Sequence, residues 1–159
     1  LTISIDGVDF EILRTRDERD VIVHGSSMVM KMTVKDGEET PTVMFLGDLD
    51  KISGEFFLNE TPKEKLKSDI VQMAHHGNWA VDKNVYDAVN AKIRLWPITF
   101  WLWQDHKIWL VDKVRSWFGI EENNYTDGDI LACGYGEYPK DYTSISDWKK
   151  CVDKMKIIL

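Results

Sequence analysis

Two short stretches of this sequence carry side chains that bind metal ions in proteins. Asp48 follows the apolar run 43–46 and a glycine. His75 and His76 follow a second apolar run at 70–74. Carboxylate oxygens and imidazole nitrogens are ligands of zinc, manganese and iron. Because the strands of an α/β sheet position the residues that follow them, we expect Asp48 and one or both histidines to converge on a metal ion.

The apolar pattern predicts the elements that must position these side chains. Asp6-Gly7 between two alternating runs predicts an amino-terminal hairpin, and Thr61-Pro62 predicts a loop or turn. The predicted strands cover residues 2–5, 8–13, 27–34, 42–46, 68–74, 92–96 and 129–133, and the predicted helices cover 51–59, 82–91, 106–118 and 146–156. The strands at 27–34 and 42–46 should pair antiparallel. Strands that alternate with helices favour a layered α/β fold.

The composition is that of one globular domain with an acidic surface. The 159 residues are 43% hydrophobic and 30% charged, and this length suits a single domain. Lys and Arg number 20 against 27 Asp and Glu, which gives a net charge of −7. This charge argues against a general nucleic-acid-binding surface, because phosphate binding needs clustered basic residues.

The ends of the chain and its cysteines bear on where the protein works. The longest strongly apolar run, residues 95–103, is shorter than the roughly 20 residues of a membrane-spanning helix, so no membrane segment is expected. The chain opens with a strand pattern rather than a signal peptide. It lacks an initiator methionine, so we expect it to be part of a longer protein. Cys133 and Cys151 show no CxxC spacing and are predicted to be unpaired thiols of a cytoplasmic protein.

Three segments in order resemble the second half of the metallo-β-lactamase fold. They are a Ser-containing strand at 25–32, a strand ending in Gly-Asp at 43–48, and a strand ending in His-His-Gly at 67–77. Asp48 and His75 are 27 positions apart. The pattern is similar to the ComEC-like branch, which includes the hydrolase domain of a competence DNA-uptake protein. The resemblance covers residues 1–136, and residues 137–159 are predicted to form a helical extension on the same domain.

The resemblance implies a fold and a chemistry. The fold is the carboxy-terminal half of an αββα sandwich, with a mixed or mainly antiparallel sheet and flanking helices. In the family Asp48 would be the catalytic residue that bridges two zinc or manganese ions, and His75 or His76 would bind one of them. Such a centre activates water for attack on an ester, amide or phosphodiester. We expect only one of the two histidines to be a ligand, because adjacent residues at a strand end point in opposite directions.

The strongest motif of the family, His-x-His-x-Asp-His, is absent from this chain, whose four histidines are at 24, 75, 76 and 106. The chain alone should therefore hold only part of a metal site and be inactive. Three hypotheses remain open. The chain is a hydrolase fragment completed by a missing amino-terminal half, or a catalytically degenerate binding or structural module, or a small protein whose metal site is completed by a second copy in a homodimer. A nucleic-acid partner is implied only by the resemblance.

Other residues have two interpretations each. His24 is an extra ligand or a surface residue, and His106 is a solvated residue at a helix start. Ser26 and Ser27 should form hydrogen bonds at a strand start rather than act as nucleophiles. Trp79 and the tryptophans in 96–103 wall a pocket or pack in the core.

A half sandwich leaves one face of its sheet open for a partner. The methionines on one side of the strand at 27–34 should line this face: Met28, Met30 and Met32.

Overall fold

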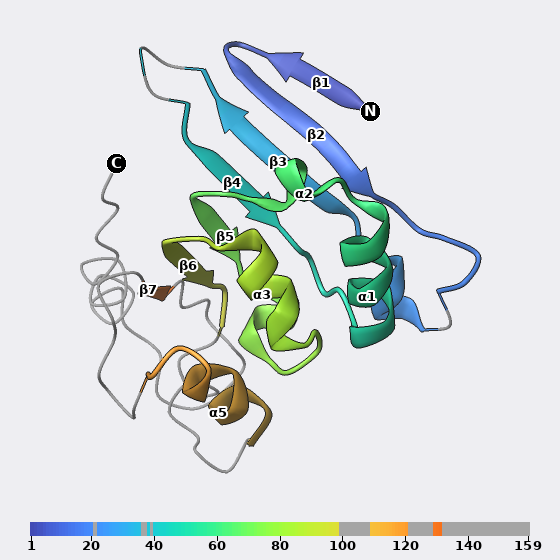
Figure 1. Ribbon diagram of the computed structural model, residues 1–159, viewed down its shortest axis with the longest axis vertical. Coiled ribbons are helices and arrows are strands. Elements are labelled where there is room, and N and C mark those ends of the chain that lie inside the picture. The colour runs from blue at the N-terminus through green and yellow to red at the C-terminus, as the bar shows by residue number, and fades with distance from the viewer. Residues whose placement is uncertain (21, 36–37, 39, 99–108, 121–128, 132–159) are drawn as a thin grey trace, which may run out of the picture.

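One mixed sheet runs through the chain in sequence order (Figure 1). The computed structural model describes residues 1–20, 22–35, 38, 40–98, 109–120 and 129–131. Within them the sheet has seven strands: β1 (Thr2–Ile5), β2 (Val8–Arg14), β3 (Val29–Val34), β4 (Thr42–Phe45), β5 (Ile70–Gln72), β6 (Ile93–Trp96) and β7 (Asp129–Leu131). Strands β1 to β4 pair antiparallel, as predicted for β3 and β4. Strands β4 to β7 pair parallel.

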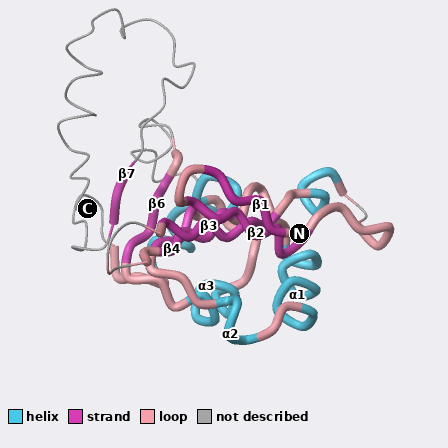
Figure 2. Tube along the Cα trace, turned by 90° about the horizontal axis from the view of Figure 1, so that it is seen from above, coloured by secondary structure: helices cyan, strands magenta, loops and turns pink. Residues whose placement is uncertain are grey.

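Helices connect the parallel strands. They are α1 (Lys51–Glu60) and α2 (Lys63–Leu66) before β5, α3 (Lys83–Val89) before β6, and α5 (Trp109–Ser116) before β7. Two short 3-10 helices, η1 (Val23–Ser26) and η2 (Ala74–Gly77), lie before β3 and after β5. Figure 2 shows α1, α2 and α3 together on one side of the sheet. The predicted layered α/β fold with a mixed sheet is confirmed.

Two local predictions were wrong. Helix α2 forms where a loop or turn was expected after Pro62, because one turn is too short to show a helical period and is stabilised by burial of Leu66. The strand predicted at 68–74 ends at Gln72, because the chain turns into η2.

Several predictions concern residues outside the described part of the chain. They are the extension at 137–159 with its helix at 146–156, and the roles of Cys133, Cys151 and His106. In the described part of the chain, no helix is long and apolar enough to cross a bilayer.

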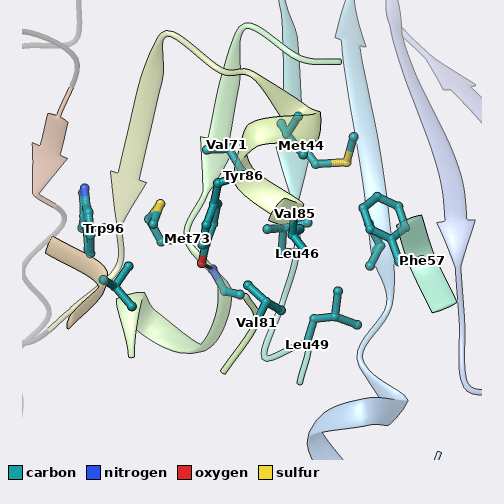
Figure 3. Close-up of a cluster of buried hydrophobic side chains, with 14 of the residues drawn as sticks. Met44, Leu46, Leu49, Phe57, Val71, Met73, Val81, Val85, Tyr86 and Trp96 are labelled. Atoms are coloured by element: carbon teal, nitrogen blue, oxygen red, sulfur yellow. Dashed lines mark hydrogen bonds between the residues drawn. The ribbon is translucent and has the colours of Figure 1, made fainter. Parts of the chain in front are cut away.

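The hydrophobic core lies between the sheet and the helices (Figure 3). Met44 in β4 and Val71 in β5 are paired in register and almost fully buried. Phe57 of α1 and Val85 of α3 cover this face of the sheet. Trp96 is fully buried in the same cluster, which decides between its two interpretations in favour of core packing. Residues 99–103 lie outside the described part.

The opposite face of the sheet is apolar. The strand registers align six side chains in one row across it: Ile3, Phe10, Met32, Val43, Ile70 and Ile93. A neighbouring row contains Ile12, Met30 and Phe45. Lys31 and Glu11 alternate with these rows and contact the α2 region on the other side. Met30 and Met32 therefore lie on the face away from α2, as predicted, whereas Met28 precedes β3 and has no partner in the strand register.

A buried ion pair joins the end of β2 to the segment before η1, and a hydrogen bond joins that segment to α1. The Asp20 carboxylate contacts the Arg14 guanidinium, and their side chains are 0% and 8% exposed. Asp20 also accepts hydrogen bonds from Asp17 N at 2.7 Å and from Ser53 Oγ at 2.9 Å. Burial acts to raise the pKa of Asp20, but the hydrogen bonds, first that from Arg14, outweigh burial and lower it. Since Ser53 belongs to α1, this contact positions η1 beside α1.

We expect Asp20→Ala to lower the free energy of unfolding by about 3–5 kcal/mol, because the Arg14 charge would stay buried without its carboxylate. The control is Asp17→Ala, which removes an exposed ion pair with Arg19 and should cost less than about 1 kcal/mol. Urea denaturation followed by circular dichroism measures both losses. Equal losses in the two variants would contradict the role given to the buried pair.

Candidate metal centre

Four loops meet at one edge of the sheet. Strands β4, β5 and β6 are parallel, so the residues after them share that edge. Asp48 follows β4, His75 and His76 follow β5, and Pro97 follows β6. Strand β3 is antiparallel to β4, so His24, which precedes β3, also reaches this edge. The topology thus brings Asp48 and the histidine pair together, as the sequence predicted.

Asp48 lies in the turn between β4 and α1. Its neighbours Leu46 and Leu49 are fully buried, while the Asp48 side chain is 41% exposed. Gly47 before it adopts a left-handed backbone with φ +58°, which lets the chain turn sharply out of the strand. The Asp48 backbone N donates to Ser27 Oγ at 3.0 Å. The hydrogen-bonding role expected for Ser27 is confirmed, and its partner is the backbone of Asp48.

Gln72 ties the end of β4 to the end of β5. Its Oε1 accepts hydrogen bonds from Leu46 N at 3.1 Å and from Gly47 N at 3.0 Å. These two backbone groups lie just past β4, where the ladder no longer pairs them. Gln72 was not among the residues predicted for this site. The available signal was an amide side chain inside an otherwise apolar strand.

The two histidines lie in a left-handed turn. His75 has φ 49° and ψ 48°, His76 has φ 61° and ψ 17°, and Gly77 has φ 85°. His75 N donates to Gly47 O at 2.9 Å, and the backbone N and Nδ2 of Asn78 donate to His75 O at 2.9 and 3.0 Å. The assumption that the two histidines are strand-end residues was therefore wrong. The strand has already ended, and their directions depend on the turn.

His76 presents a ring nitrogen to Asp48. The distance between His76 Nε2 and Asp48 Oδ1 is 3.6 Å, too long for a hydrogen bond. On the other side of the ring, Nδ1 lies 3.0 Å from Pro97 O. A carbonyl only accepts, so Nδ1 carries a proton, and in the neutral form of the ring Nε2 has the lone pair that faces the carboxylate. A cation between the two atoms would satisfy both, and two ligands at about 2 Å from one ion fit this separation.

His75 packs against His24. Their ring centroids are 4.5 Å apart with the planes tilted by 42°, while the His75 and His76 centroids are 6.1 Å apart. Burial first, and then the neighbouring His24, lowers the pKa of His75. The ring is therefore neutral at pH 7, the form in which imidazole binds metals. The position of His24 before an antiparallel neighbour of β4 was the sequence signal that it belongs to this edge.

The described residues do not assemble a complete ligand set. Among them, no group of three or more His, Cys, Asp or Glu side chains is arranged to hold a metal ion. Structural zinc has four ligands, and catalytic zinc has three from protein. Asp48 and His76 fit two of these positions. A full coordination sphere would need donors beyond those two.

Trp79 is part of the margin of the core. Its side chain packs against the buried cluster, and Lys113 Nζ lies 3.0 Å from the centroid of its ring. Its indole N–H donates to Asp82 Oδ1 at 3.4 Å. These contacts favour the packing interpretation of Trp79 over a pocket wall.

Known proteins give no further guidance to the site. No family model, no curated protein and no solved structure matches this chain.

Gly77 allows the histidine turn to lie on Trp96. A Cβ atom at Gly77 would come within 2.4 Å of Trp96 Cε3, and its φ of +85° is also unfavourable for a side chain. The glycine thus lets the turn approach the core closely.

We expect Gly77→Ala to lower the free energy of unfolding by about 2–5 kcal/mol, from the left-handed strain together with the clash. Gly119→Ala is a matched control, because Gly119 has φ +69° but no atom near its Cβ position, and should cost about 1–2 kcal/mol. Urea denaturation of both variants provides the comparison. If Gly77→Ala lowers the free energy of unfolding no more than Gly119→Ala does, the expected clash with Trp96 adds nothing to the loss.

Proposed function

We propose that this chain is the carboxy-terminal half of a metal-dependent hydrolase of the metallo-β-lactamase superfamily, and that Asp48 and His76 are two of its metal ligands. The observation that carries the proposal is the facing pair of side-chain atoms, His76 Nε2 and Asp48 Oδ1, 3.6 Å apart. Zinc or manganese suits this donor pair. When bound, the metal supplies an activated water for attack on an ester or phosphodiester.

The surroundings of the pair support the proposal. The Pro97 carbonyl bound to Nδ1 sets the tautomer of His76, as partners of metal-binding histidines do in known sites. The bond from its backbone N to Ser27 holds the Asp48 main chain, while the second carboxylate oxygen leaves a position for another ion. The His75 ring centroid lies 6.1 Å from that of His76, and His75 packs on His24.

Donors from another polypeptide segment would complete the centre. In the proposal they come from an amino-terminal half that carries His-x-His-x-Asp-His, or from a second copy of this chain. The apolar rows that contain Phe10, Met30 and Met32 are the surface on which a second sheet would pack in an αββα sandwich. The acidic charge of this half favours substrates smaller than a nucleic-acid polymer, unless the other half is basic.

A second candidate is a binding or structural module without catalysis. It is favoured by the absence, among the described residues, of any group of three potential ligands arranged for a metal. In such a module, protonation of His76 would satisfy the Asp48 carboxylate as an exposed ion pair. Metal titration separates the two candidates.

We expect the 159-residue chain to bind Zn²⁺ weakly, and Asp48→Ala or His76→Ala to weaken this binding by about tenfold or more, because each change removes one of two ligands. Glu60→Ala is the control, since Glu60 is an exposed carboxylate paired with Arg19. Isothermal titration calorimetry, with Co²⁺ absorption as a second probe, measures the affinities. Identical affinities in all four proteins would reject this site.

We expect the chain alone not to hydrolyse phosphodiester or ester reporter substrates above background with added zinc or manganese. A hydrolytic centre needs enough fixed ligands to hold the metal while one position stays open. Fusion to an amino-terminal half bearing the missing histidines should yield turnover that Asp48→Ala abolishes and Glu60→Ala retains. If the isolated chain shows turnover that Asp48→Ala removes, this half assembles a working site by itself and the fragment hypothesis is wrong.

A further inference from the structure

The outer edge of β1 exposes backbone groups and apolar side chains to which another strand can bind. Among the strands that the structure describes, β1 is the end of the sheet and pairs only with β2. All of its residues are exposed, and Leu1, Ile3 and Ile5 are 81%, 45% and 56% exposed. By register, Ile3 continues the apolar row that passes through Phe10. Large apolar side chains therefore extend to the free edge of the sheet.

The hydrogen bonds between β1 and β2 determine which backbone N–H and C=O groups of β1 face away from the sheet. Leu1 O accepts a bond from Ile12 N at 2.9 Å, so Leu1 directs its backbone toward β2. Backbone direction alternates along a strand, and Ile3 and Ile5 therefore also face β2. Thr2 and Ser4 direct their N–H and C=O groups away from the sheet. Within the described residues, no strand pairs with that edge.

Strand β1 also lacks the features that usually protect an edge. Its sequence, Thr-Ile-Ser-Ile, contains no charge, proline or glycine. The register shift in this part of the sheet lies between β2 and β3, near Ile12 and Arg14, and not at β1. Natural edge strands are commonly blocked by charges, prolines or bulges. A regular, uncharged edge of this kind is a template for another strand.

We propose that a second copy of this chain pairs antiparallel with β1, with the two-fold axis at Ile3. In this register Ile3 faces the partner's Ile3, and Leu1 faces the partner's Ile5. Thr2 faces the partner's Ser4, and these two residues exchange both backbone hydrogen bonds because both direct their groups outward. The two sheets thereby become one continuous sheet with an isologous interface.

The edge is complementary to itself, which is why the occupant is a second copy. Read in opposite directions, residues 1–5 place apolar side chains opposite apolar ones and hydroxyls opposite hydroxyls. The nearest acid, Asp6, lies in the turn beyond the paired segment, so the two copies of this carboxylate lie at opposite ends of the interface. The inference uses no residue of the metal centre and does not depend on the proposed hydrolase.

Cysteine cross-linking tests the register. In a Cys133→Ser, Cys151→Ser background, Ile3→Cys should form a disulfide-linked dimer, because directly facing non-hydrogen-bonded residues have Cα atoms about 4.5 Å apart, within disulfide range. Ile5→Cys alone should not, since its own copy lies about four residues, or roughly 13 Å, along the strand. A mixture of Leu1→Cys and Ile5→Cys proteins should cross-link. Ile3→Cys that stays monomeric, or Ile5→Cys that links to itself as readily, overturns the proposal.

A backbone substitution tests the hydrogen bonds. Ser4→Pro removes an outward N–H from each copy and should weaken the dimer about tenfold or more in sedimentation equilibrium. Ser4→Ala is the matched control, because it loses only the 2.7 Å bond from Ser4 Oγ to Asp9 and keeps the N–H. Thermal unfolding checks that both variants are folded. A dimer unaffected by Ser4→Pro would show that copies associate through the sheet face instead.

Discussion

Parallel pairing of β4 with β5 is the constraint on which the candidate site depends. It places the ends of these strands at one edge, where Asp48 and the histidine turn meet. Gln72 joins the two strand ends beyond the last ladder pair. Antiparallel pairing of β3 with β4 then brings His24 to the same edge. Without the change from antiparallel to parallel pairing at β4, these residues would be distributed over both ends of the sheet.

The histidine turn stores backbone strain that neighbouring contacts offset. Two consecutive non-glycine residues in the left-handed region cost of order 1–3 kcal/mol each. The bonds of His75 to Gly47 and Asn78, and the close packing of Gly77 on Trp96, hold the turn against this cost. Strain of this kind concentrates at functional sites. The turn therefore fixes where the two imidazoles lie at a cost in local stability.

Much of the fold follows from patterns that act over a few residues. The Asp6-Gly7 turn, the alternation in β3 and the apolar run of β4 each specify their own conformation, and the structure has strands there. Errors arose where the local signal was short or ambiguous. The single turn of α2 has no periodicity of its own, and the apolar Met73 and Ala74 read as strand although they lead into η2. In both places tertiary packing outweighs propensity.

The sequence by itself determined that Asp48, His75 and His76 follow apolar strands, because strand patterns and the residues that end them are local. Only the tertiary structure decided that His76 faces Asp48, that Pro97 sets its tautomer and that His24 packs on His75. It also decided that the open apolar face continues to the edge of β1. These contacts join residues that lie far apart in the chain, and their geometry depends on strand register and turn conformation, which no local pattern encodes.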